Sequence, residues 1–112
     1  MLRILILDDD LDCSIFLKKC LEEKGHIARH ILTKGAIPYI IDEFNPQIII
    51  ADILHLHYIN SECLIKVSKQ TPIILLSGCT FNYIETTLHI YGVVQKPFNF
   101  DLLENRIQEL FK

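Results

Sequence analysis

Two hydrophobic patterns alternate along the chain, and together they predict alternating strands and helices. Short, almost continuous apolar runs have the length and composition of buried strands, and they lie at 2–7, 27–32, 47–52, 73–76 and 92–95. Between these runs, apolar residues recur at the three- and four-residue spacing of a helix face. Strands that are apolar throughout are typical of sheets covered by helices on both faces, so we expect a parallel sheet in an α/β fold.

The first and last helices carry the clearest signals. In the first, charged residues lie opposite an apolar face, and Gly25 is placed to end the helix as its C′ residue. That apolar face consists of Cys13, Phe16, Leu17, Cys20 and Leu21. Asn99 is a favourable N-cap for the last helix. The apolar face of this last helix consists of Leu103, Ile107, Leu110 and Phe111, with Leu102 beside it.

Weaker helical patterns fill the remaining intervals, at 34–44, 59–67 and 81–91. Pro38 falls in the first turn of the earliest of these, where a helix tolerates proline. The resulting order is βαβαβαβαβα, and right-handed crossovers then place helices on both faces of the sheet. We therefore expect one doubly wound α/β domain that spans residues 1–112.

Composition narrows the class of protein. The net charge of −3 provides no basic footprint, so we expect no nucleic-acid partner. No apolar run reaches the roughly 20 residues that a membrane-spanning helix needs, and the N-terminus lacks the features of a signal peptide. The cysteines form no CxxC pair and are expected to be buried, reduced thiols, which indicates a cytoplasmic location. They are Cys13, Cys20, Cys63 and Cys79.

Polar residues follow the apolar strands at the point where each strand ends. Parallel strands bring their carboxyl ends to one edge of the sheet, and ligands bind there in folds of this class. Each residue alone has an ordinary explanation, such as a helix cap, a turn hydroxyl or a solvated charge. Their coincidence at four strand ends favours a shared site. These residues are Asp8, Asp9, Asp52, Ser77 and Lys96.

The side chains in this set suit phosphoryl chemistry. Three carboxylates together would bind a hard divalent cation, most plausibly Mg²⁺, which prefers oxygen ligands. A carboxylate can also attack phosphorus and form an aspartyl phosphate. The cation and Lys96 would neutralise charge on the transferring group. Ser77 would donate a hydrogen bond to it, and Gly78 leaves room for it.

Four segments resemble the receiver domain of response regulators in two-component signalling, of the chemotaxis type. They occur in that family's order and cover essentially the whole chain: ILILDDD at 4–10, IIIAD at 48–52, IILLSG at 73–78 and VVQKPF at 93–98. The resemblance implies a five-stranded parallel (βα)5 flavodoxin-like sheet with strand order 2-1-3-4-5. It also implies a single receiver domain over 1–112.

The resemblance assigns a role to each acid near the site. Asp52 corresponds to the phosphoacceptor. Asp9 and Asp52 would ligate Mg²⁺ directly, together with the backbone carbonyl of Leu54, while Asp8 would act largely through water. Asp10 would serve only as a helix cap.

The remaining motif residues are assigned in the same way. Ser77, with Gly78 beside it, corresponds to the hydroxyl that binds the phosphoryl group, and Lys96 to the lysine paired with it. Pro97 corresponds to the proline that follows a cis peptide bond. The position that usually carries an aromatic switch residue holds Val93, which has no comparable rotamer swing.

The loop after Asp52 also departs from the family. His55 and Leu56 replace the common Met-Pro, and Asn60 replaces a glycine, which should loosen the loop 54–60. The spacings from Asp52 to Ser77 and from Ser77 to Lys96 are several residues short, so the intervening helices are expected to be trimmed. The pair His55 and His57 could instead contribute to a transition-metal site, although no further ligands at regular spacing support that interpretation.

The leading functional hypothesis is a phosphoaccepting signalling switch, which is not an enzyme beyond its own phosphorylation and dephosphorylation. Its partners would be a sensor histidine kinase or phosphotransfer protein and a downstream effector. A homodimer could form through the fourth helix, fifth strand and fifth helix. Two alternatives stay open: a pseudo-receiver, used for interaction without phosphorylation, and a haloacid-dehalogenase-like phosphatase that uses Asp8 and Asp10.

Overall fold

A computed structural model of the chain describes residues 1–8, 10–31, 37–52, 62–77, 90–95 and 99–111. Its strands are β1 (Arg3–Leu7), β2 (Ile27–Ile31), β3 (Ile48–Asp52), β4 (Ile73–Ser77) and β5 (Ile90–Gln95). Its helices are α1 (Leu11–Glu23), α2 (Ile37–Phe44), α4 (Glu62–Ser68) and α5 (Phe100–Leu110).

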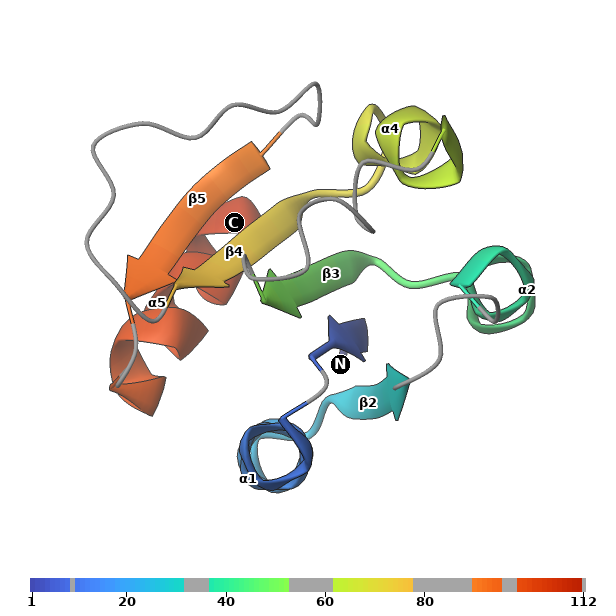
Figure 1. Cartoon of the computed structure of the whole chain (residues 1–112). Helices are drawn as coiled ribbons and strands as arrows, with labels where there is room; N and C mark the ends of the chain where they lie inside the picture. The colour runs from blue at the N-terminus through green and yellow to red at the C-terminus, as the bar shows by residue number, and fades with distance from the viewer. Residues whose placement is uncertain (9, 32–36, 53–61, 78–89, 96–98, 112) are drawn as a thin grey trace.

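The five apolar runs form one parallel sheet in the order β2-β1-β3-β4-β5, as Figure 1 shows. Adjacent strands pair in register, with Leu7 opposite Ala51 and Asp52 opposite Leu76. All the strands therefore end at the same edge of the sheet, which we call the carboxyl edge, and begin at the opposite amino edge. The doubly wound α/β fold and its strand order are confirmed.

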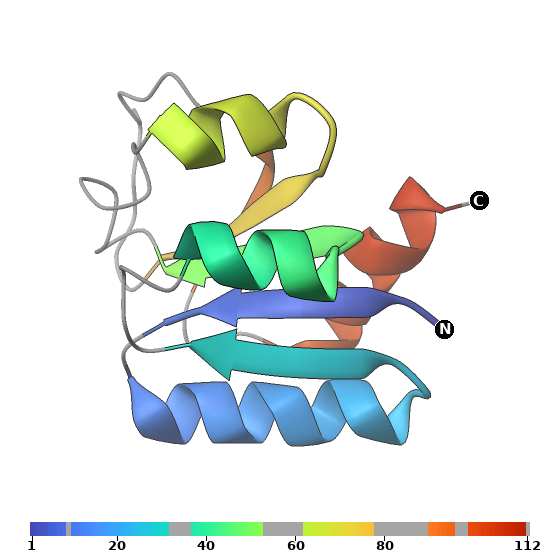
Figure 2. The ribbon, with the colours of Figure 1, turned by 90° about the vertical axis from the view of Figure 1, so that its right-hand side faces the viewer.

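Helices cover both faces of the sheet and create two separate cores (Figures 1 and 2). Successive strand residues point to opposite faces, so each all-apolar strand contributes to both cores. Helices α2 and α4 pack on the face formed by Leu5, Leu7, Ile49, Ala51, Ile73 and Leu75. Helices α1 and α5 pack on the face formed by Ile4, Ile6, Ala28, Ile48, Ile50, Ile74 and Leu76.

The ends of α1 are fixed by local chemistry that the sequence encodes. Asp10 is the N-cap, and its carboxylate accepts a hydrogen bond from the Cys13 N–H at 3.2 Å. At the other end Gly25 adopts a φ of +90°, which side-chain-bearing residues rarely adopt. The Gly25 N–H then donates to Glu22 O at 3.0 Å and the His26 N–H to Leu21 O at 3.1 Å, a Schellman motif. The prediction that Gly25 ends this helix is confirmed.

Helix α5 also begins as the sequence predicts. The Asn99 side chain accepts a hydrogen bond from the Asp101 N–H at 2.8 Å, which satisfies one of the unpaired donors of the first turn. Leu103 and Ile107 are fully buried against the sheet. Phe111, predicted as part of the same face, is the exposed C-cap residue, because the helix ends before it.

The buried stripe of α1 differs from the predicted one. It consists of Ser14, Leu17 and Leu21, whereas Phe16 is 54% exposed. The sheet contacts only a narrow strip of this helix, so the flanking positions of the apolar face stay near solvent. Cys13 and Cys20 form no disulfide within the described part of the chain and are only partly buried, whereas buried thiols were predicted.

Partial burial still affects the chemistry of Cys20. Desolvation raises the pKa of its thiol above the ordinary value, Glu23 raises this pKa further, and Lys19 opposes them. A raised pKa reduces the thiolate fraction and therefore the reactivity of the thiol. The side chain of Cys63 and the whole of Cys79 lie outside the described residues.

The helix predicted over 81–91 is wrong at its end. Ile90 and Tyr91 belong to β5, and Ile90 pairs with Ile73 before a register irregularity leads to the pairing of Ile74 with Gly92. Pairing with β4 provides the backbone hydrogen bonds that a helix would otherwise supply. The rest of that predicted helix, 81–89, lies outside the described residues, as do residues 34–36 of the pattern predicted over 34–44.

Within the part of the chain that the structure describes, no helix combines the length and apolar character needed to cross a bilayer.

Neighbouring leucines on α5 test the packing of the core. Leu103 is fully buried, whereas Leu102 is 61% exposed. We expect Leu103→Ala to lower the free energy of unfolding by about 2–5 kcal/mol, because it leaves a cavity against the sheet. The matched change Leu102→Ala should lower it by less than about 0.5 kcal/mol. Urea unfolding monitored by circular dichroism measures both values, and equal effects would contradict the packing of α5.

Candidate functional site

The candidate site lies at the carboxyl edge and begins with two aspartates on adjacent strands. Leu7 at the end of β1 pairs with Ala51 in β3, so the next residues along each strand are Asp8 and Asp52. Adjacent strands lie about 4.8 Å apart. Asp8 and Asp52, separated by 44 positions in sequence, therefore lie side by side at the edge of the sheet. The strand register thus places both residues at the carboxyl edge.

Both carboxylates are almost fully withdrawn from solvent. Asp8 is 2% exposed and Asp52 is 3% exposed. Burial of an ionised carboxylate is unfavourable unless hydrogen bonds or an opposite charge compensate it. The site thus concentrates negative charge in a place where a cation or another electropositive group would stabilise it.

Asp8 is held in place by the first turn of α1. Its carboxylate oxygen Oδ1 accepts a hydrogen bond from the Asp10 N–H at 2.9 Å. Its backbone carbonyl accepts a second from the Ser14 hydroxyl at 3.0 Å. Asp10 itself is exposed and caps α1, so Asp8 and Asp10 have the distinct roles that the sequence suggests.

Ser14 is a site residue that the sequence analysis missed. It is fully buried on the α1 stripe, at the spacing shared by Leu17 and Leu21. A serine at an apolar stripe position has to satisfy its hydroxyl inside the protein, and Asp8 O provides the acceptor. That polar interruption of the stripe was the signal available in the sequence.

The two described carboxylates fit a hard divalent cation. They are buried, adjacent and oxygen-only, which is the donor chemistry that Mg²⁺ prefers. Among the described residues, no group of three or more His, Cys, Asp or Glu side chains could hold a metal ion. Asp9, the third acid of the predicted set, is not among those residues.

The other predicted site residues are only partly placed. Ser77 is the last residue of β4 and pairs with Gln95 of β5, so its backbone reaches the carboxyl edge beside Asp52. Its side chain is not described. Several predicted positions lie outside the described residues altogether, together with the loop that carries His55, Leu56, His57 and Asn60: these positions are Asp9, Leu54, Gly78, Lys96 and Pro97.

Several solved response-regulator receivers have the same architecture as this chain. The response regulator TrrA, solved in complex with the histidine kinase ThkA, is similar with a TM-score of 0.82 and 25% identity, and the match covers 100% of both chains. The chain has the fold of a response-regulator receiver domain. The chemotaxis response regulator CheY4 of Vibrio cholerae has a TM-score of 0.82 at 18% identity over 99% of both chains. A Francisella receiver domain, that of response regulator 1452, has a TM-score of 0.76 at 22% identity over 98% and 96%.

The similarity is carried by structure rather than by sequence. No protein-family model matches the sequence, and no curated protein matches it.

Within the receiver fold, Val93 lies in β5 and is 41% exposed, and Tyr91 two residues earlier is also exposed. A valine in this place has no ring that could turn between an outward and an inward position.

The cap residue of α1 offers a test of the local support for Asp8. We expect Asp10→Ala to lower the free energy of unfolding by about 1 kcal/mol, because the Cys13 N–H loses its acceptor. Asp10→Asn should be nearly neutral, since asparagine caps a helix about as well as aspartate. Chemical denaturation of the three proteins measures the difference. Equal losses in both variants would show that charge, and not capping, is the contribution of Asp10.

Proposed function

We propose that this receiver accepts a phosphoryl group on Asp52 as part of two-component signal transduction. The observation that carries the proposal is the pair of buried carboxylates, Asp8 and Asp52, side by side at the carboxyl edge of a receiver fold. Asp52 is the last residue of β3, the central strand, with β1 on one side and β4 on the other, whereas Asp8 follows the end of β1. The role of Asp8 is then to help hold the cation beside Asp52.

The chemistry requires one nucleophile and strong electrostatic support. A carboxylate oxygen of Asp52 attacks phosphorus, an O–P bond forms, and the bond from phosphorus to the donor's leaving nitrogen or oxygen breaks. The leaving group keeps the electron pair and takes a proton. The phosphoryl group is removed when water attacks phosphorus. The bond from phosphorus to the Asp52 oxygen then breaks, inorganic phosphate leaves and the carboxylate is restored. The chain is thus a signalling domain rather than an enzyme that acts on other substrates.

Magnesium is part of the proposal because of the donor set. Bound Mg²⁺ supplies charge neutralisation for the phosphoryl oxygens. Asp8 and Asp52 would hold it together with Asp9 and the Leu54 carbonyl, the positions that the family resemblance indicates. Ser77 would donate a hydrogen bond to the phosphoryl group, and Lys96 would neutralise part of its charge.

Intact mass spectrometry tests the phosphoacceptor directly. With a small-molecule phosphodonor such as acetyl phosphate and Mg²⁺, we expect wild type to gain one phosphoryl group and Asp52→Asn to gain none. Removal of divalent cations with a chelator should abolish the reaction in wild type, because the charge of the phosphoryl oxygens is then no longer neutralised by the cation. Label that persists in Asp52→Asn and disappears in Asp8→Asn would instead support the phosphatase hypothesis.

A histidine kinase or phosphotransfer protein is the proposed donor, and the surface of α1 supports this choice. A donor must approach the carboxyl edge to reach Asp52. Exposed apolar side chains run along α1 from the same edge, at Leu11, Ile15 and Phe16. The receiver TrrA was solved in complex with a histidine kinase, which is consistent with a partner of this kind. We propose that the donor docks on this α1 surface.

Paired measurements separate docking from chemistry. We expect Phe16→Asp to lower the rate of phosphotransfer from the cognate kinase by roughly tenfold or more, as loss of an exposed aromatic anchor does at interfaces. Phosphorylation by acetyl phosphate should not change, because a small-molecule donor does not need the docking surface on α1. Tyr39→Asp on α2, an exposed aromatic on the opposite face, is the control and should leave both rates unchanged. An equal loss with both donors would contradict a docking role.

A pseudo-receiver is the second candidate, and Val93 is the observation that favours it. Without an aromatic side chain at this position, the usual inward rotation cannot report phosphorylation. The exposed residues Tyr91, Val93 and Leu102 could still serve a downstream effector or a homodimer through α4, β5 and α5. The mass measurement decides between the candidates, since a pseudo-receiver gains no phosphoryl group.

A further inference from the structure

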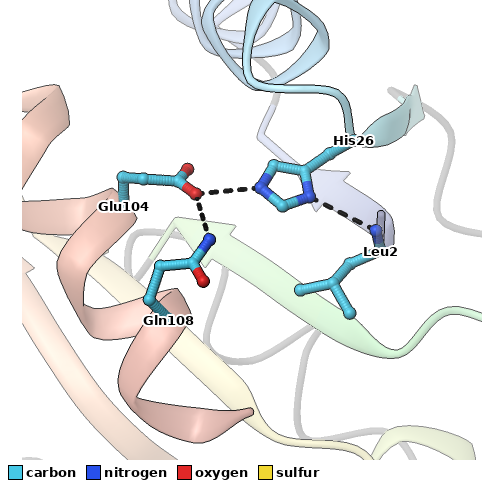
Figure 3. A network of polar contacts seen from close by, with 4 residues as sticks. All are labelled: Leu2, His26, Glu104 and Gln108. Carbon is cyan, nitrogen blue, oxygen red and sulfur yellow. Dashed lines mark hydrogen bonds and ion pairs between the residues drawn. The ribbon is translucent and has the colours of Figure 1, made fainter. Parts of the chain in front are cut away.

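A buried polar cluster, drawn in Figure 3, lies beside the start of β1, whereas Asp8 follows the end of that strand. It joins His26, Glu104, Gln108 and the backbone N–H of Leu2. His26 is 7% exposed and Glu104 is 9% exposed. Buried titratable side chains are unfavourable unless they are paired, and the phosphoryl chemistry proposed above uses neither of these.

Hydrogen-bond directions determine where the protons of this cluster lie. The Leu2 N–H donates to His26 Nδ1 at 3.3 Å, so Nδ1 has to keep its lone pair. The proton of the neutral ring is therefore on Nε2, which donates to Glu104 Oε1 at 2.9 Å. Gln108 Nε2 donates to the same oxygen at 2.7 Å. Glu104 Oε2 is buried and has no hydrogen-bond partner within the described part of the chain.

The cluster gives α5 a directional attachment that its apolar contacts do not provide. Leu103 and Ile107 bury α5 against the sheet, but apolar burial is non-directional and tolerates small rotations and shifts of a helix. Hydrogen bonds through Glu104 depend on both distance and angle. The bond to His26 therefore constrains the position of α5 along and around its axis.

His26 is in turn attached to a rigid pair of elements, α1 and β1. The Schellman motif at the end of α1 fixes the backbone of His26, and the Leu2 N–H fixes its ring to the start of β1. At the opposite edge, Asp8 at the end of β1 is bonded to Asp10 and Ser14 at the start of α1. Because α1 and β1 are bonded to each other at both ends, a displacement at Asp8 moves both elements.

We propose that His26 is a positioning residue that couples α5 to the acidic site at the opposite edge. A change at Asp8 and Asp52 shifts the pair formed by α1 and β1, and the bond from His26 to Glu104 carries that shift to α5. Such coupling is reciprocal, so the state of α5 also affects the acids. The inference concerns the charge of the site and does not require that Asp52 be phosphorylated.

Two amide substitutions of His26 separate its two bonds. His26→Gln places an amide near the position of Nε2 and keeps a donor for Glu104, but it loses the acceptor for Leu2. His26→Asn places an amide near the position of Nδ1 and keeps that acceptor, but it no longer reaches Glu104. Both variants replace the ring with an uncharged amide, so they are matched for loss of the imidazole. Only His26→Asn removes the hydrogen bond between His26 and Glu104 of α5.

The coupling is measured by combining each variant with Asp52→Asn, which removes one of the two adjacent buried carboxylates. The readout is the hydrogen-exchange protection of α5 amides, followed by NMR on the full chain. We expect Asp52→Asn to change this protection about threefold or more in the parent and in His26→Gln, and by less than about 1.5-fold in His26→Asn. Independent distant substitutions combine within about twofold, so a threefold interaction is significant. Asp42→Asn, the same change at an exposed position on α2, is the control and should have no effect.

The possible outcomes are distinct. An equal effect of Asp52→Asn in the parent and in His26→Asn, including no effect in either, would overturn the coupling. If His26→Asn does not fold, Glu104→Met breaks the same bond from the α5 side and takes its place in the cycle. These single and double variants are compared without a phosphodonor. A chain that fails to accept a phosphoryl group can therefore still show the coupling, and a chain that accepts one can still lack it.

Discussion

The parallel register of β1 and β3 is the constraint on which the acidic site depends. Leu7 lies opposite Ala51, and this pairing alone makes Asp8 and Asp52 neighbours. A slip of one residue would turn every side chain of one strand to the other face. The strands are apolar on both faces, so alternation of polar and apolar residues cannot specify this register. Polar contacts at the amino edge do so instead.

Those contacts join the start of β1 to the segment before β3. The Arg3 N–H donates to Gln47 Oε1 at 2.9 Å, the Gln47 N–H donates to Arg3 O at 2.8 Å, and Arg3 Nε donates to Asn45 O at 2.9 Å. The backbone bond from the Gln47 N–H to Arg3 O would be broken by a slip in register. The apolar interior thus supplies most of the favourable burial, while a few bonds outside it determine which residues meet at the far edge.

Sequence was sufficient where a structural feature depends on neighbouring residues. Gly25 and Asn99 fulfil their predicted roles because a C′ glycine and an N-cap act within one turn of the helix. The strand order followed from the family resemblance, and the shared edge of Asp8 and Asp52 followed from parallel topology, which brings strand ends together. Packing and pairing between particular residues distant in sequence could not be predicted. Helical spacing could not show that the sheet would leave Phe16 exposed, and it gave no sign that β4 would draw Tyr91 into a strand.

The bond from His26 to Glu104 is the clearest example of a contact that the sequence could not predict. The two residues are 78 positions apart, and each looks ordinary in its own segment. Glu104 falls between Phe100 and Ile107 at helical spacing, where it interrupts the buried face of α5, much as Ser14 interrupts the face of α1. In both helices a polar residue on a buried stripe marks the point where that helix is bonded to another element. Ser14 bonds the start of α1 to Asp8, and Glu104 bonds α5 to His26 just beyond the end of α1. The two polar residues therefore mark the places where the two ends of α1 are joined to the acidic site and to α5.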